Sequence, residues 1–308
     1  MLPDAAHPER GSFVRDQVAA LRTLADVELE TYEFPPGARS LGRAAAELRR
    51  RFAGARRGAV RLDVVHAHFG LTAWPALAVP ARVRAVTLHG TDVRHPRTRI
   101  ASVAALPLMD LVGVVSDSLA AELPSARLRR RAVTLPCGVD TERFVPIDRA
   151  RARAELGLPE APYLLFPADP ARPLKRHDRA LELERVTGAR LLSLGGVDPR
   201  AVPLWVNAAN AVIIPSEREG FGLAVLEALA CDVPVLATPV GIHPEALAGV
   251  QGTLCAPFDL ATWAEALAPH LRSHDPRVAG RDRAQAFSTV RMAQCVLAAW
   301  RAAVQRSG

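Results

Sequence analysis

The sequence is poor in the residues that cross-link small domains or build metal sites. Its cysteines number only four and are widely separated (Cys137, Cys231, Cys255 and Cys295). Their spacing matches no metal-binding motif, and we expect no metal site. Scattered cysteines of this kind are typical of buried apolar positions in a reducing compartment, so we expect a cytoplasmic protein.

Long apolar runs are also missing. The most apolar stretch, residues 100–115, contains Pro107 and Asp110 and is too short to span a bilayer. The N-terminus lacks a basic region followed by an apolar run, so the sequence gives no sign of secretion. With 308 residues, of which 49 % are hydrophobic and 23 % charged, the chain has the composition of a globular protein with about two domains.

Lysine is almost absent, since Lys175 is the only one, and the net charge of +7 comes from arginine. Aromatic residues make up 5 % of the chain, too few to interleave with these charges for base stacking, so we expect no nucleic acid partner. Two arginine clusters are either solvated faces or a peripheral contact with anionic lipid at the inner membrane face or with an acidic acceptor. The clusters are Arg39, Arg43, Arg49, Arg50, Arg51, Arg56 and Arg57, and Arg127, Arg129, Arg130 and Arg131.

Short apolar runs alternate with amphipathic helical stretches, which predicts α/β domains with doubly wound parallel sheets. The expected strands of the first half are 27–34, 63–68, 85–88, 111–115 and 132–135. Those of the second half are 163–166, 190–194, 211–215 and 234–238.

The predicted domains are residues 1–147 and 148–289, with a joint within 143–162. A C-terminal segment, 290–308, is expected to form a helix that packs back on the first domain. A doubly wound domain normally opens with a buried strand, but this chain begins in a polar loop and enters a helix near Ser12. Either the first domain lacks a central strand or its start lies upstream of Met1.

The most informative segment is residues 215–227, Pro-Ser-Glu-Arg-Glu-Gly-Phe-Gly-Leu-Ala-Val-Leu-Glu. A strand ends at Pro215, a glycine-bearing loop follows, and a helix starts near Gly222. Glycines permit close backbone approach, and the amides at the helix start suit a phosphate. Glu227 lies one turn beyond Leu223, where its carboxylate suits the paired hydroxyls of a ribose. Glu219, in the loop itself, is placed to accept hydrogen bonds from sugar hydroxyls.

This segment resembles the glutamate-pair signature of the retaining glycosyltransferases of family four, which have the GT-B fold. The similarity covers essentially the whole chain and includes residues 64–69, 88–92, 135–140 and 234–241. The resemblance implies two Rossmann-like domains facing across a cleft, with the donor held mainly by the second. It also implies a nucleotide-sugar-dependent, metal-independent transferase with no cofactor. The acceptor, whether lipid, glycan or small molecule, stays unidentified.

The resemblance implies roles for five residues of the loop and the following helix. It places Glu219 near the donor sugar and Glu227 on the ribose. The amides of Phe221, Gly222 and Leu223 are implied to hold sugar hydroxyls and phosphate.

A basic loop after the first strand of the second domain contains Arg172 and Lys175. Breaking a glycosidic bond to a diphosphate leaves negative charge on the departing oxygen, and a fixed cation there lowers the barrier. The position of Lys175 is similar to the family's phosphate lysine. The family usually has an arginine where this chain has Asp169, and Arg172 is expected to supply that charge from a different position.

His89 follows a predicted strand of the first domain, and the resemblance implies that it lies close to the donor's anomeric carbon. His66 and His68 lie at a strand end and are weaker candidates, and we interpret His66 as mainly structural. Gly11 resembles a glycine whose amide approaches the diphosphate.

Other functions remain open at this point. The chain is alternatively a catalytically impaired nucleotide-sugar-binding relative of the same fold. Another GT-B enzyme, such as an epimerase or a phosphorylase, needs acid and base groups or a cofactor lysine that the sequence does not offer. An NAD dehydrogenase is not expected, because no Gly-x-Gly-x-x-Gly opens a helix after a strand.

Overall fold

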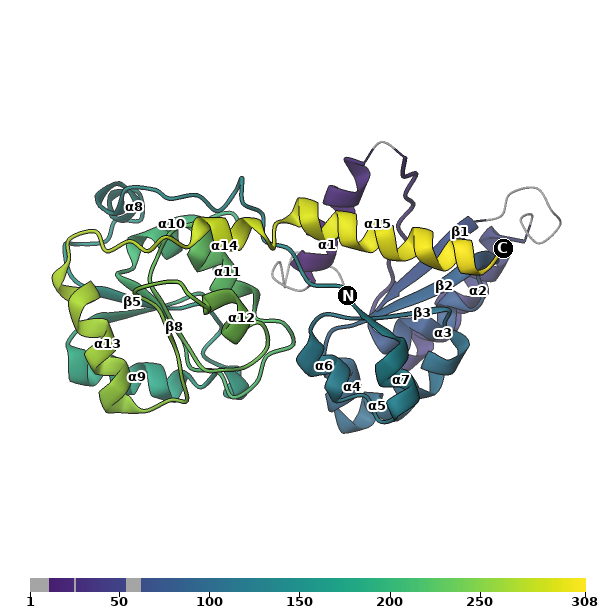
Figure 1. Ribbon diagram of the computed structural model, residues 1–308, viewed down its shortest axis with the longest axis horizontal. Coiled ribbons are helices and arrows are strands. Elements are labelled where there is room, and N and C mark those ends of the chain that lie inside the picture. Colours follow the sequence, from purple (N-terminus) through teal and green to yellow (C-terminus); the bar gives the residue numbers. More distant parts are fainter. Residues whose placement is uncertain (1–10, 25, 54–61) are drawn as a thin grey trace. The chain divides into compact units, whose positions relative to one another are not determined.

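Figure 1 shows the computed structural model, which describes residues 11–24, 26–53 and 62–308. The chain divides into two compact domains. The described residues up to Cys137, together with Val290–Gly308, form the first domain, and Gly138–Thr289 forms the second.

The first domain contains a parallel sheet of four strands in the order β1-β2-β3-β4. The strands are β1 (Leu62–His68), β2 (Ala81–Leu88), β3 (Leu111–Val114) and β4 (Ala132–Thr134). Every residue of β3 is buried, as expected for a strand with helices on both faces. The helices are α1 (Ser12–Arg22), α2 (Ala38–Arg51), α3 (Ala73–Ala76), α4 (Thr91–Arg94), α5 (Pro96–Ala105), α6 (Asp117–Ala121) and α7 (Ala126–Arg131).

The C-terminal helix, α15 (Thr289–Arg306), packs on the core of the first domain and is drawn in yellow in Figure 1. Ala303 joins a buried cluster with Val83 and Leu111 of the sheet. Val296 joins a second cluster that includes Leu21 of α1. These apolar contacts attach the last helix to the first domain, because burying each side chain contributes about 1 to 3 kcal/mol.

The second domain contains a parallel sheet of five strands in the order β6-β5-β7-β8-β9. The strands are β5 (Tyr163–Phe166), β6 (Arg190–Ser193), β7 (Ala211–Ile214), β8 (Val235–Ala237) and β9 (Leu254–Cys255). The helices are α8 (Arg149–Glu155), α9 (His177–Thr187), α10 (Val202–Ala208), α11 (Leu223–Ala230), α12 (His243–Leu247), α13 (Leu260–Arg272) and α14 (Arg281–Gln285). The prediction of two parallel-sheet α/β domains is confirmed.

One predicted strand is wrong. Residues 27–34 form no regular secondary structure and join neither sheet. Instead Leu29 packs on the cluster around Leu21, and the Tyr32 hydroxyl donates to Glu47 of α2 at 2.8 Å. Alternating apolar residues satisfied the strand pattern, but side-chain packing on α1 and α2 replaces strand pairing. The short edge strand β9 was not predicted, because two residues carry no periodicity.

Residues 138–147 lie in the second domain, although the sequence analysis placed them in the first. Two hydrogen bonds explain this position. The Val139 amide donates to Phe287 O at 2.9 Å, and the Ile147 amide donates to the Asn207 side chain at 2.8 Å.

Across the described ranges, we find no helix that is both long enough and apolar enough to cross a membrane.

Candidate active site

The glycine loop of the second domain, residues 215–222, connects β7 to α11. Gly222 has φ of 100°, and a Cβ there would lie 2.5 Å from Nε2 of His243. Only glycine fits this conformation and this space. The Ile242 amide donates to Phe221 O at 2.8 Å, so the loop after β8 supports the loop after β7. This hydrogen bond supports the backbone just before the start of α11.

Lys175 and Glu219 meet at this loop. Lys175 ends a 3-10 turn, η4 (Pro173–Lys175), and its Nζ donates to Oε1 and Oε2 of Glu219 at 2.7 and 2.8 Å. The Ser216 hydroxyl donates to Oε1 of Glu219 at 2.7 Å. Glu219 is only 8 % exposed, so the fold places a buried carboxylate in direct contact with the only lysine of the sequence.

The protonation of Glu219 follows from these contacts. Burial favours the neutral acid, but the Lys175 charge and the hydrogen bonds from Lys175 and Ser216 outweigh it, and the pKa of Glu219 is lowered. Glu219 is therefore an ionised acceptor at neutral pH. Outside this pair, Arg176 adopts a left-handed φ of 58° and donates to Glu217 at 2.7 Å, which ties the lysine loop to the glycine loop.

Three further residues of the predicted donor site, Arg172, Asp169 and Glu227, lie outside the Lys175–Glu219 pair. Arg172 is exposed, and within the described part of the chain its guanidinium has no ion-pair partner. Asp169, which stands where the family usually has arginine, accepts a hydrogen bond from the Ala171 amide at 2.8 Å. Glu227 is half-buried on α11, four residues after Leu223.

His243 is a site residue that the sequence analysis missed. It is completely buried, and its Nδ1 donates to Thr238 O at 2.9 Å. Its Nε2 lies against Gly222 and has no hydrogen-bond partner among the residues that the structure describes. Burial lowers the pKa of His243. No local pattern marks this histidine, because its importance comes only from contact with a loop 21 positions earlier.

In the first domain, His89 follows the end of β2. Its amide donates to the buried carboxylate of Asp92, which also accepts from the amides of Gly90 at 2.8 Å and Gly70 at 3.2 Å. Gly11 is the N-cap of α1 with a φ of 65°. Two residues later, the ring of Phe13 lies 4.7 Å from the His89 ring, so the start of α1 is beside His89.

Three histidines gather at this end of the first sheet. His68 Nδ1 and His89 Nε2 share a hydrogen bond of 3.1 Å, and His66 Nε2 bonds Thr87 Oγ1 at 2.7 Å. Burial lowers the pKa of all three, and that of His68 falls to about 4. The rings are therefore neutral near pH 7. Among residues 11–24, 26–53 and 62–308, no group of three or more His, Cys, Asp or Glu has metal-binding geometry.

Family models match both parts of the chain. The model described as Glycosyltransferase Family 4 matches residues 5–143, and the model described as Glycosyl transferases group 1 matches residues 168–273. A protein of Mycobacterium avium (strain 104) named D-inositol 3-phosphate glycosyltransferase is 33 % identical, over 79 % of this chain and 70 % of that protein. A protein of the same name from Saccharomonospora viridis is also 33 % identical, over 79 % of this chain and 70 % of its own length.

Solved structures agree on the fold. Sucrose-phosphate synthase from Thermosynechococcus elongatus superposes with a TM-score of 0.68 at 22 % identity, covering 98 % of this chain and 95 % of that one. HepE from Anabaena, in complex with UDP-glucose, superposes with a TM-score of 0.69 at 15 % identity, covering 95 % and 96 %. The fold of this chain is GT-B. With both halves matched and two such relatives, the chain belongs to family four of the glycosyltransferases, the glycosyl transferases group 1.

Proposed function

We propose that this protein transfers a sugar from a nucleoside-diphosphate sugar to an acceptor with retention of the anomeric configuration. The observation that carries the proposal is the Lys175–Glu219 pair at the glycine loop. The pair places a cation and a buried carboxylate, which can accept hydrogen bonds from sugar hydroxyls, in the same domain as the amides at the start of α11. Each of these groups has a partner in a nucleoside-diphosphate sugar, and we propose no resident metal or cofactor.

Lys175 provides the charge that the leaving diphosphate needs. As the glycosidic bond breaks, negative charge builds on the phosphate oxygen, and an ammonium held beside it stabilises that charge. The amides of Gly222 and Leu223 suit the phosphate, since a helix start favours an anion. Lys175 contacts Glu219 through Nζ, so in this proposal the ammonium divides its three N–H donors between Glu219 and the phosphate.

The two glutamates supply the acceptors for neutral parts of the donor. We assign Glu219 to the hydroxyls of the transferred sugar and Glu227 to the ribose hydroxyls. Attack from the face that the diphosphate leaves requires no carboxylate nucleophile. A phosphate oxygen of the donor takes the acceptor proton, and the protein contributes orientation and charge stabilisation. His89 is assigned to the sugar near its anomeric carbon, and Gly11 and Arg172 to the diphosphate.

The donor assignment is tested by thermal shift with UDP, GDP, ADP and TDP. A ligand at one hundred times its dissociation constant adds about 2.7 kcal/mol to the free energy of unfolding. We expect one nucleotide to raise the melting temperature of the wild type. Because Glu227 holds the ribose, Glu227→Ala is expected to lose most of that rise.

Glu182→Ala is the matched control, because Glu182 is exposed on α9 of the same domain, and it is expected to keep the full shift. If none of the four nucleotides raises the melting temperature of the wild type, the assignment of the donor site is wrong. If a nucleotide binds but its sugar conjugate is neither hydrolysed nor transferred, the chain is a nucleotide-sugar-binding protein instead.

The curated relatives are named for D-inositol 3-phosphate, so this phosphorylated polyol is the first acceptor to assay.

The four cysteines are unpaired, which suits the reducing environment of the cytosol.

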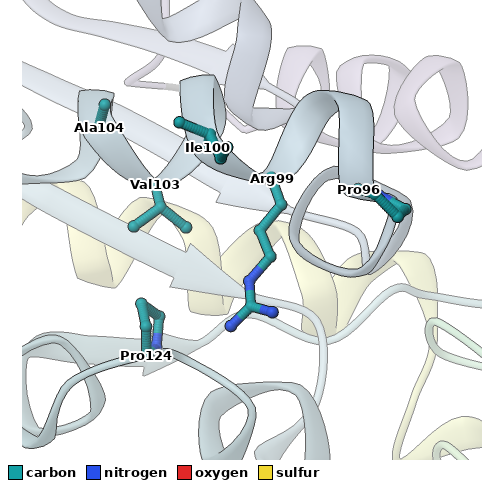
Figure 2. Close-up of a pocket in the computed structure, with 6 residues that line it drawn as sticks. All are labelled: Pro96, Arg99, Ile100, Val103, Ala104 and Pro124. Carbon is teal, nitrogen blue, oxygen red and sulfur yellow. The ribbon is translucent and has the colours of Figure 1, made fainter.

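We also propose a peripheral contact between the first domain and an anionic membrane. Ile100 on α5 is 80 % exposed and borders a cavity of about 550 Å³. The cavity is lined by Pro96, Arg99, Ile100, Val103, Ala104 and Pro124. Figure 2 shows Arg99 extending from α5 toward the segment that carries Pro124. An apolar patch with exposed cations suits lipid tails beneath anionic headgroups.

The arginine clusters of the sequence analysis give this contact weaker support. The side chains of Arg129 and Arg131 donate to the backbone oxygens of Leu123 and Met109. Arg51 forms an ion pair with Glu30. Arg56 and Arg57 lie outside the described residues.

Vesicle co-sedimentation tests the membrane contact. Burying an isoleucine side chain contributes about 1.5 to 3 kcal/mol, so Ile100→Glu is expected to weaken binding to phosphatidylcholine vesicles with 30 % phosphatidylglycerol about tenfold. Leu181→Glu, at an apolar residue that is 46 % exposed on α9, is the control and is expected to bind as the wild type does. Equal binding by both variants would exclude this surface.

A further inference from the structure

Three histidines of the first domain, His66, His68 and His89, lie in one column. In the parallel pair β1–β2, His68 lies opposite Thr87, so His89 follows two residues later on the same face. The His66 and His68 rings are stacked with centroids 4.9 Å apart, and the His68 and His89 centroids are 5.4 Å apart. The column therefore runs from the middle of β1 to the candidate catalytic histidine.

At the His66 end of the column, the ring is held by the C-terminal helix α15. The indole N–H of Trp300 donates to His66 Nδ1 at 2.9 Å, and an indole can only donate. His66 Nδ1 is therefore the acceptor, and its proton sits on Nε2, which donates to Thr87 Oγ1 at 2.7 Å. Both nitrogens of His66 are occupied, so this histidine contacts no ligand and the column is not a metal site.

At the other end of the column, His68 and His89 bond to each other. His68 Nδ1 and His89 Nε2 share one hydrogen bond of 3.1 Å, and two neutral rings place a single proton in it. Phe13 and Phe69 both contact the His89 ring, each with its centroid 4.7 Å away and its plane tilted by 44° or 45°. The ring is thus held by two tilted aromatic contacts and by His68 at one nitrogen.

We propose that His68 is a positioning residue, which occupies Nε2 of His89 and thereby leaves Nδ1 as the nitrogen that meets the donor sugar. This inference rests on the proposed function, because it takes His89 as the residue near the reacting sugar. Burial keeps both rings neutral, and the pKa of His68 is lowered to about 4. A neutral His89 whose Nε2 is bonded to His68 offers the sugar one defined nitrogen rather than a rotating ring.

Three substitutions separate positioning from packing. In His68→Asn, the amide occupies the place of Nδ1 and can still bond His89. In His68→Gln, the amide reaches the place of Nε2 instead, and His68→Leu keeps bulk without any polar group. Because a misplaced catalytic group lowers the rate on the order of 100-fold, we expect kcat to fall about 10- to 100-fold in the Gln and Leu variants and about threefold or less in the Asn variant.

The assay is release of nucleoside diphosphate from UDP-glucose, GDP-mannose and ADP-glucose, with binding of the matching diphosphate as the second readout. Binding is expected to be equal in all four proteins, since Lys175, Gly222 and Leu223, which are assigned to the diphosphate, belong to the other domain, and Gly11 is assigned to it only through its backbone amide. Equal losses of kcat in the Asn and Leu variants, or no loss in the Leu variant, would overturn the inference. A wild type that turns over none of these donors would contradict the proposed function itself.

Histidine ¹⁵N NMR of the wild type decides the inference if the variants do not fold. We expect His68 and His89 to give neutral-ring nitrogen shifts at pH 7, with the Nδ1 of His89 changing when the donor sugar binds. A doubly protonated His89, or a sugar-dependent change confined to its Nε2, would refute the assignment.

Discussion

Lys175→Ala is expected to lower kcat for sugar transfer about 1,000-fold, because removal of one preorganised group that stabilises transition-state charge has an effect of about 100- to 1,000-fold, and the lysine is the cation that contacts Glu219. Nζ of Lys175 lies 2.7 Å from Oε1 of Glu219, so its removal also leaves a buried carboxylate without a cation. Breaking a buried pair in this way costs about 3 to 5 kcal/mol. The measurement is kcat at a temperature where thermal melting shows the variant to be folded.

The loss of charge is separated from the loss of stability by two further variants. The double substitution Lys175→Ala with Glu219→Gln removes the unpaired carboxylate, so its melting temperature is expected to recover while transfer stays low. Lys175→Arg keeps a charge but presents a planar fork in place of a compact ammonium, and we expect a loss of about tenfold or more. Because Glu219→Gln is itself expected to lower transfer, the double variant is compared with that single variant, and equal transfer by the two would show that Lys175 acts only through folding.

Glu219→Gln is expected to separate binding of the nucleoside diphosphate from transfer. The amide keeps the shape of the carboxylate but releases Lys175 from its ion pair, so affinity for the diphosphate is expected to stay the same or rise up to about tenfold. Transfer is expected to fall more than about 100-fold, because an amide offers one acceptor oxygen where the carboxylate offers two. Isothermal titration and donor turnover measure the two effects. A large loss of diphosphate affinity would place Glu219 on the phosphate instead.

The same variant has a signature in the pH dependence of stability. The pKa of Glu219 is lowered from its ordinary value of 4.5, so its ionised form stabilises the folded state above pH 4.5, and this contribution is lost as pH falls below that value. The melting temperature of the wild type is therefore expected to drop more steeply below pH 4.5 than that of Glu219→Gln.

Much of the architecture was predictable from local patterns. Buried runs such as β5 and β7 are nearly continuous stretches of apolar residues, and this pattern predicts parallel strands with helices on both faces. The glycine loop was predictable because glycines in a sequence mark turns and close backbone approaches. Gly222 has the positive φ that glycine favours. The strand predicted at 27–34 was wrong, because alternation of apolar and polar residues does not reveal whether a neighbouring strand exists.

The sequence by itself determined which residue types this protein brings to its site: one lysine, two glutamates eight positions apart, a glycine-bearing loop and a histidine after a strand. The tertiary structure decided which of them touch. Lys175 contacts Glu219 across 44 positions, and Trp300 sets the proton of His66 across 234. Such pairings depend on the order of strands in each sheet and on where α15 packs. The strand order and the position of α15 depend on the apolar surface that the whole domain buries, and no local spacing of residues determines that total.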